Sequence, residues 1–200
     1  MKHSVIITAL ITILLLNSCV KSLHPLTDDP KDMVFKKELL GKWKDAKENT
    51  VYLVDTIPNT AGKTYTVTVI DHSADKSFDT SNFVMMLTKL NGNYFVDCAP
   101  DIEDQKYSKI SDVNKSLLLA THFFSRIFSM DKNLITLSII DNSELSLLLK
   151  ANKIKMMYQT INKDEVLLLD NSKILRQKLM ELEKFTSVYK KKDSLIRISN

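Results

Sequence analysis

Histidine, serine and acidic side chains are the groups with which this sequence could carry out nucleophilic or acid–base chemistry. Asp71-His72-Ser73 contains the three residue types of a hydrolase triad in a single run. Neighbouring residues on a strand or turn point in different directions, whereas the members of a triad converge through the fold. We therefore expect this tripeptide to be a polar turn after a strand that ends at Ile70.

The spacing of the other candidate ligands does not indicate a metal site. No histidine stands at i, i+4 with a second one, as zinc motifs require, among His3, His24, His72 and His122. His122 precedes two phenylalanines, and a hydrogen-bonded strand histidine is expected there. A run of acids lacks both the spacing and the glycine of an EF-hand, so a solvated acidic loop is expected for Asp97, Asp101, Glu103 and Asp104. The chain contains only three glycines, which argues against a glycine-rich phosphate-binding loop. The sequence predicts no metal and no cofactor.

The first residues have the pattern of a signal peptide, which we expect to cover residues 1–18. A cationic start at Lys2 is followed by twelve uncharged residues, Val5 to Leu16. As a helix this stretch would rise about 18 Å, whereas a bilayer core needs about 20 apolar residues. It is therefore too short for a membrane span and fits the apolar region of a cleavable signal.

The end of that segment, Leu16-Asn17-Ser18-Cys19, resembles the lipobox of bacterial lipoproteins. The resemblance implies a diacylglycerol on Cys19, cleavage before it, and palmitate-type acylation of the new amino group. Two or three acyl chains hold a protein stably at a membrane. Val20, in place of an aspartate, favours the outer membrane, with the periplasmic or surface face left open. Cys98 would then be a lone thiol, which we expect to be buried.

Composition and patterning divide the remainder into a lead-in and one domain. Residues 19–36 contain Pro25 and Pro30 and indicate a lipid-anchored tether or a lead-in that hugs the surface. Residues 37–200 are expected to form a single globular domain, because 44% hydrophobic and 26% charged residues are an ordinary globular balance.

Strand signals dominate this domain. Thr64 to Ile70 alternates apolar residues with threonine. Two hairpins are expected, one joining 82–90 to 94–98 through Asn91-Gly92-Asn93 and one joining 121–130 to 134–140. Two further strands are indicated at 155–158 and 166–169.

Two helices complete the pattern. One follows a capping sequence at Asp141, and the other is capped by Asp170-Asn171-Ser172 and runs to about Tyr189 with an apolar stripe. No βαβ rhythm is present. We therefore predict a mainly β fold, an antiparallel β-barrel or strongly curved sheet, lipocalin-like, with two helices, one of them C-terminal.

Two resemblances bear on family. Residues 22–26 (SLHPL) and 39–45 (LLGKWKD), with similar patterns at 95–97 and 121–124, resemble an uncharacterised group of bacterial lipoproteins. Gly41-Lys42-Trp43 also matches the Gly-x-Trp of lipocalins, in which the Trp closes one barrel end beneath an Arg from a late strand. This second resemblance implies that Trp43 plugs the base of a ligand cup. The Thr-Asp-Tyr motif of lipocalins is missing and no late strand clearly offers the Arg, so a Trp that simply anchors the core stays open.

Charge argues against nucleic acid as a partner. The net charge is +4, and the basic residues are scattered except at Lys190–Lys192. Our first hypothesis for function is a non-enzymatic envelope lipoprotein that acts as an interaction or accessory module, anchored to the membrane through Cys19 and binding an envelope protein. The second is a lipocalin-like binder of a small apolar ligand or lipid, and the third is an envelope hydrolase.

Overall fold

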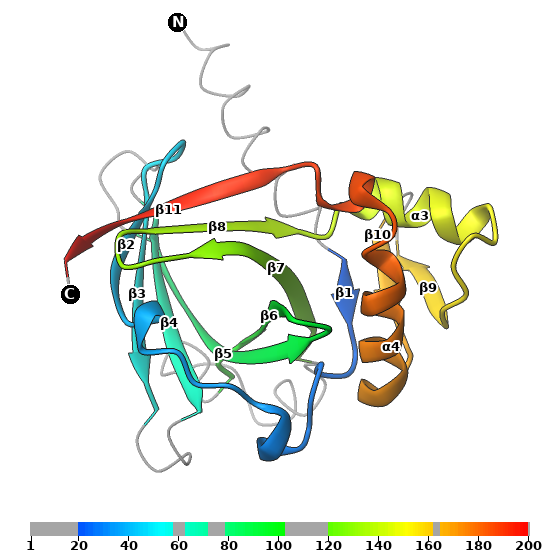
Figure 1. Cartoon of the computed structure of the whole chain (residues 1–200), viewed down its shortest axis with the longest axis horizontal. Coiled ribbons are helices and arrows are strands. Elements are labelled where there is room, and N and C mark those ends of the chain that lie inside the picture. Colours follow the sequence, from blue (N-terminus) through cyan, green and yellow to red (C-terminus); the bar gives the residue numbers. More distant parts are fainter. Residues whose placement is uncertain (1–19, 58–62, 72–78, 103–119, 162–164, 200) are drawn as a thin grey trace, which may run out of the picture.

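Eight antiparallel strands close into a barrel. A computed structural model of the chain describes residues 20–57, 63–71, 79–102, 120–161 and 165–199. The barrel strands follow one another in sequence and β11 returns to pair with β2: β2 (Gly41–Asp45), β3 (Thr50–Thr56), β4 (Thr64–Asp71), β5 (Asp79–Leu90), β6 (Asn93–Pro100), β7 (His122–Met130), β8 (Leu134–Ile139) and β11 (Lys192–Ser199). The predicted mainly β fold with a barrel and two helices is confirmed (Figure 1).

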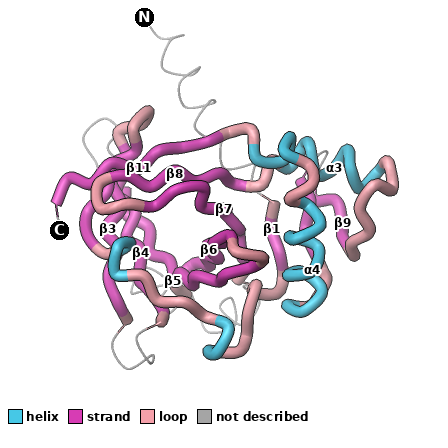
Figure 2. The backbone as a smooth tube through the Cα atoms, in the orientation of Figure 1, coloured by secondary structure: helices cyan, strands magenta, loops and turns pink. Residues whose placement is uncertain are grey.

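A side extension carries the helices. β1 (Lys21–Ser22) pairs with the start of β7 and, in parallel, with β10 (Glu165–Leu168), which pairs with β9 (Tyr158–Ile161). The helices α3 (Asn142–Lys150) and α4 (Ser172–Leu182) lie on this side of the barrel (Figure 2). No helix among the described residues combines the length and apolar character needed to cross a bilayer.

The two predicted hairpins are present, and each turn has a local cause. Asn91 and Gly92 both adopt positive φ, 48° and 84°, which is the conformation of a type I′ turn. In the second hairpin the Asp131 carboxylate accepts hydrogen bonds from the backbone N–H groups of Asn133 and Leu134. Both turns use short polar side chains or glycine to reverse the chain.

The helices begin where their caps predict. The Asp141 side chain accepts hydrogen bonds from the N–H groups of Ser143 and Glu144 at the start of α3, and Asn171 caps α4 through the N–H of Ile174. The predicted end of α4 was wrong. The helix stops at Leu182, and a separate 3-10 turn, η4 (Thr186–Tyr189), places Val188 and Tyr189 in the core.

The apolar residues form two cores, one inside the barrel and one outside it. Inside, strands contribute alternate residues to a cluster around Trp43 and Tyr65. Outside, Leu175, Leu179 and Leu182 of α4 pack with Leu26, Phe95 and other residues of the outer wall. The predicted stripe of α4 therefore covers the barrel flank.

Three strands were missed by the sequence reasoning and one was displaced. β1, β3 and β11 were not assigned, and β2 was indicated only by the resemblance of Gly41-Lys42-Trp43 to the lipocalin motif. The strand expected at 155–158 lies at Tyr158–Ile161. β11 follows the Lys190–Lys192 run, where a solvated end was expected.

Residues 20–36 pack along the barrel as a lead-in. Val20 is 1% exposed, β1 joins the sheet, and Leu26 is fully buried. The segment continues through η1 (Pro30–Asp32) and along β5, where Met33 bridges to Thr88 and the Val34 N–H donates to the Leu87 carbonyl.

The Asp141 cap makes the stability of α3 depend on pH. Burial raises the pKa of Asp141, but hydrogen bonds from Ser143 and Glu144 and the charge of Lys191 outweigh it and hold the pKa below its ordinary 3.8. The stabilisation is therefore complete above that value and is lost as the pH falls through the folded-state pKa. We predict that Asp141→Ala costs about 1 kcal/mol at pH 7 and less at pH 3, measured by urea unfolding. Asn171→Ala removes a cap that does not titrate and should cost the same at both values; equal pH behaviour of the two variants would contradict this account.

Candidate functional site

The barrel lumen has a floor built around Trp43. Its side chain is fully buried, and its indole N–H donates to the carbonyl oxygen of Leu39 at 2.8 Å. Leu39 ends the 3-10 turn η2 (Lys37–Leu39), which precedes β2. This hydrogen bond therefore links the segment that precedes the barrel to the inward-facing side chain of Trp43 on β2.

Arg197 is the residue that packs on Trp43. It lies directly opposite Trp43 in the β2–β11 pairing, and its guanidinium carbon is 4.1 Å from the centre of the indole ring. The guanidinium donates to the carbonyls of Leu40 at 2.6 Å and Glu38 at 2.7 Å, and Nε donates to that of Lys132. The expectation that no late strand supplies an Arg was wrong, because β11 was not recognised as a strand.

The segment before β2 completes this closed end. The Tyr65 hydroxyl lies within hydrogen-bonding distance of both the N–H and the carbonyl of Lys36, and its ring stacks on Phe35 at 5.5 Å. Leu39 and Tyr65 are 4% and 0% exposed. This end of the lumen is therefore packed with side chains and backbone.

The opposite half of the lumen is lined by side chains that are only partly buried. Of the partly buried apolar and aromatic residues that pack against the inner cluster, six lie in this half: Tyr52, Val69, Phe83, Phe123, Leu137 and Leu195. Pairings across the strands connect them to the floor, since Tyr52 lies opposite both Trp43 and Val69. We call this half, lined by those six residues, the cup.

Carboxylates surround the phenol at this open end. Burial and the nearby charges of Asp45, Glu48, Asp193 and Asp71 raise the pKa of Tyr52 to about 12. Burial and the charge of Asp45 likewise raise the pKa of Glu48. Lys47 pairs with Asp193 at 2.8 Å and so offsets one of these charges. The four carboxylates form an acidic rim that disfavours an anion in the cup.

Asp97 and His122 form a structural pair on the outer wall. Asp97 is fully buried, accepts a 2.7 Å hydrogen bond from the Leu26 N–H, and lies 2.8 Å from His122 Nδ1. The expectation of a solvated acid was wrong for Asp97, because the lead-in covers it. The expectation of a hydrogen-bonded strand histidine at His122 is confirmed.

The serine that pairs with His122 across the strands is already engaged in a hydrogen bond. Ser22 lies opposite His122 in the β1–β7 pairing, but it is fully buried and its hydroxyl donates to the carbonyl of His24. The hydroxyl and the N–H of His24 form a small turn that carries the chain towards Leu26. The geometry therefore favours a support for the lead-in over a hydrolytic site.

The remaining candidate residues are distributed without converging. Cys98 is a free, buried thiol, as expected, and burial raises its pKa. Lys190 pairs with Glu144 and Lys191 with Asp141, so two lysines of the basic run form ion pairs with the start of α3. Cys19, His3, and His72 with Ser73 lie outside the described residues, as do Glu103 and Asp104.

Comparison with known proteins finds no relative of this chain. No family model matches the chain, and no curated protein or solved structure does so either. The sequence resemblances to a group of bacterial lipoproteins and to lipocalins therefore stay predictions.

The Arg197 contacts give a direct prediction. A lysine keeps the positive charge but cannot donate to three carbonyls in one plane while stacking on an indole. We expect Arg197→Lys to lower the free energy of unfolding by about 2 kcal/mol, measured by urea unfolding with Trp43 fluorescence. Lys44→Arg changes an exposed residue next to Trp43 and should have almost no effect. Equal stability of Arg197→Lys and wild type would show that the contact is dispensable.

Proposed function

We propose that this protein is a membrane-anchored, lipocalin-like binder of a small apolar ligand, with the cup as its binding site. The observation that carries the proposal is the contrast between the two barrel ends. Trp43 and Tyr65 are fully buried at one end, whereas Tyr52, Phe83 and Phe123 are partly exposed at the other. A mainly apolar lining with a few polar groups is typical of small-molecule sites.

The acidic rim narrows the class of ligand. Asp45 is 8% exposed and the charges of Glu48, Asp71 and Asp193 reach the same phenol. An anionic ligand would add a further negative charge to a partly desolvated site, which is costly. A neutral or cationic apolar molecule avoids this cost, and the Tyr52 hydroxyl, protonated at physiological pH, supplies a polar group near it.

A second candidate is a non-enzymatic interaction module. Outward-facing apolar residues are exposed on β8 and β11, with Leu134 at 37%, Ile196 at 48% and Ile198 at 48%, and Leu134 lies opposite Ile196. Exposed apolar side chains that adjoin one another favour contact with another protein. This candidate would be preferred if the cup binds nothing.

The cup is tested with a neutral apolar fluorophore, N-phenyl-1-naphthylamine. We expect the purified wild-type protein to enhance its fluorescence with saturable binding. Val69→Trp fills the cup and should weaken binding at least about tenfold, a loss comparable to that of a few buried methylenes. Ile70→Trp places the same side chain on the outer face of β4 and is the matched control.

Two results would contradict the cup. One is wild-type protein that gives no saturable enhancement. The other is Val69→Trp and Ile70→Trp proteins that bind the fluorophore equally well, with circular dichroism confirming that both are folded.

The anchor is tested separately by labelling with radioactive palmitate. If Cys19 carries acyl chains, bacteria that express the wild-type protein will incorporate label and those that express Cys19→Ala will not. Cys98→Ala is the control, because it removes the other thiol of the chain and should label like wild type. Equal labelling of wild type and Cys19→Ala would refute the lipid anchor without bearing on the cup.

A further inference from the structure

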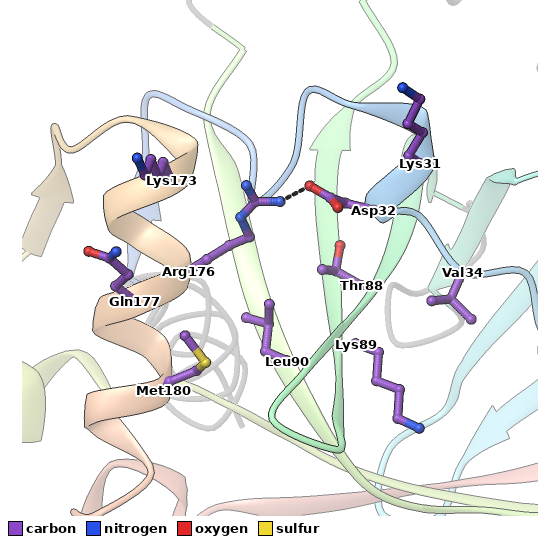
Figure 3. A pocket seen from close by; sticks show the side chains of 10 residues that line it. All are labelled: Lys31, Asp32, Val34, Thr88, Lys89, Leu90, Lys173, Arg176, Gln177 and Met180. Atoms are coloured by element: carbon purple, nitrogen blue, oxygen red, sulfur yellow. Dashed lines mark hydrogen bonds and ion pairs between the residues drawn. The ribbon is translucent and has the colours of Figure 1, made fainter.

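A second concave site lies outside the barrel, where the lead-in meets α4. It is a groove of about 520 Å³ between η1, the end of β5 and α4. Figure 3 shows α4 on one side, η1 on the other and Thr88 and Leu90 of β5 between them. We call it the α4 groove. A volume of this size is within the range of small-molecule sites, about 300–1,000 Å³.

The α4 groove has an excess of positive charge. Three cationic side chains, Lys31, Lys173 and Arg176, face one carboxylate, Asp32, while Lys89 at its edge holds its ammonium group over the Tyr94 ring at 5.5 Å. Arg176 and Asp32 form an ion pair across the groove, with side chains 24% and 44% exposed. Because several cations share a concave surface with a single acid, the local potential attracts anions.

A buried hydroxyl without a partner points to the same place. Thr88 is 1% exposed, and its Oγ1 finds no hydrogen-bond partner in the described part of the chain. In Figure 3 the hydroxyl is directed towards the ion pair of Arg176 and Asp32. Buried hydroxyl groups are normally satisfied, so the unsatisfied hydroxyl of Thr88 beside a cationic groove lacks an acceptor that a bound anion could supply.

The groove is separate from the cup. Leu87 belongs to the cluster inside the barrel, whereas the next residue, Thr88, lies in the groove on the outer wall. The apolar part of the groove comes from Val34, Leu90 and Met180. The two sites also differ in charge, since the cup has an acidic rim and the groove a cationic lining.

We propose that the α4 groove binds an anionic amphiphile, that is, a phosphate or carboxylate group attached to a short apolar body. The head group takes the place of the Asp32 carboxylate on Arg176 and accepts a hydrogen bond from Thr88. The apolar body contacts Leu90 and Met180. Asp32 then competes with the ligand head group for Arg176, and its ion pair holds the Arg176 side chain in place while the groove is empty.

The proposal is tested by isothermal titration with decyl phosphate below its critical micelle concentration. Lys173→Glu should weaken binding about tenfold, as expected for the loss of a charged contact. Lys155→Glu makes the same charge change at an exposed lysine outside the groove and should leave affinity unchanged. Asp32→Asn should tighten binding several-fold, because it frees Arg176 and removes the competing charge.

Thr88→Val separates a binding role from a structural one. It replaces an unpartnered hydroxyl with a methyl group of similar size, so Tm should not fall while decyl phosphate binds several-fold more weakly. A lower Tm with unchanged affinity would overturn the role of Thr88. Equal weakening by Lys173→Glu and Lys155→Glu, or weaker binding by Asp32→Asn, would overturn the site.

Two further probes identify the ligand chemistry. Decyl maltoside carries the same alkyl chain without charge, and inorganic phosphate carries the charge without the chain. Both should bind at least tenfold more weakly than decyl phosphate. Decyl maltoside binding as tightly would overturn the anionic head, and inorganic phosphate binding as tightly would overturn the amphiphile. Because Val69→Trp blocks the cup and not the groove, decyl phosphate should bind this variant like wild type, which keeps the two proposals distinguishable.

Discussion

Barrel closure depends on the contact between Trp43 and Arg197. β2 and β11 come from opposite ends of the domain, and their pairing is the seam that turns a sheet into a barrel. Arg197 strengthens that seam from both directions, because it stacks on the indole of β2 and donates to carbonyls before β2 and in the β7–β8 turn. A closed barrel leaves no free edge among its eight strands. The inward-facing side chains can then form a floor at one end and a cup at the other.

Charge separates the two candidate binding sites. The cup is bordered by carboxylates, and burial together with their charges raises the pKa of Tyr52 and Glu48, whereas the α4 groove gathers lysines and Arg176 around a single acid. Within β5, Leu87 faces the inner cluster of the barrel, whereas its neighbour Thr88 faces the α4 groove. Because side chains alternate along a strand, β5 lines the barrel interior with one face and the α4 groove with the other.

Local signals in the sequence were sufficient for the hairpins and helix starts. Asn91-Gly92, Asp131, Asp141 and Asn171 each act on backbone within three residues, so their effects could be predicted without the fold. Contacts between distant residues could not be predicted in this way. Asp97 is buried because Leu26, 71 residues earlier, covers it and donates to its carboxylate. Arg197 was overlooked because β11 begins with three consecutive polar residues, lacks a regular apolar alternation, and is recognisable only beside β2. The cup and the groove likewise arise from segments that only the closed barrel brings together.

The burial of Val20 limits the distance between the folded domain and any anchor at its N-terminal end. Residue 20 is in the core and residue 21 is hydrogen-bonded in the sheet, so no spacer separates the folded body from position 19. Consecutive Cα atoms are about 3.8 Å apart. If Cys19 carries acyl chains, no flexible spacer separates the barrel from the lipid. The side of the barrel that carries β1 must then lie against the bilayer in a fixed orientation. The membrane surface would then limit the angles from which a ligand or a second protein can approach.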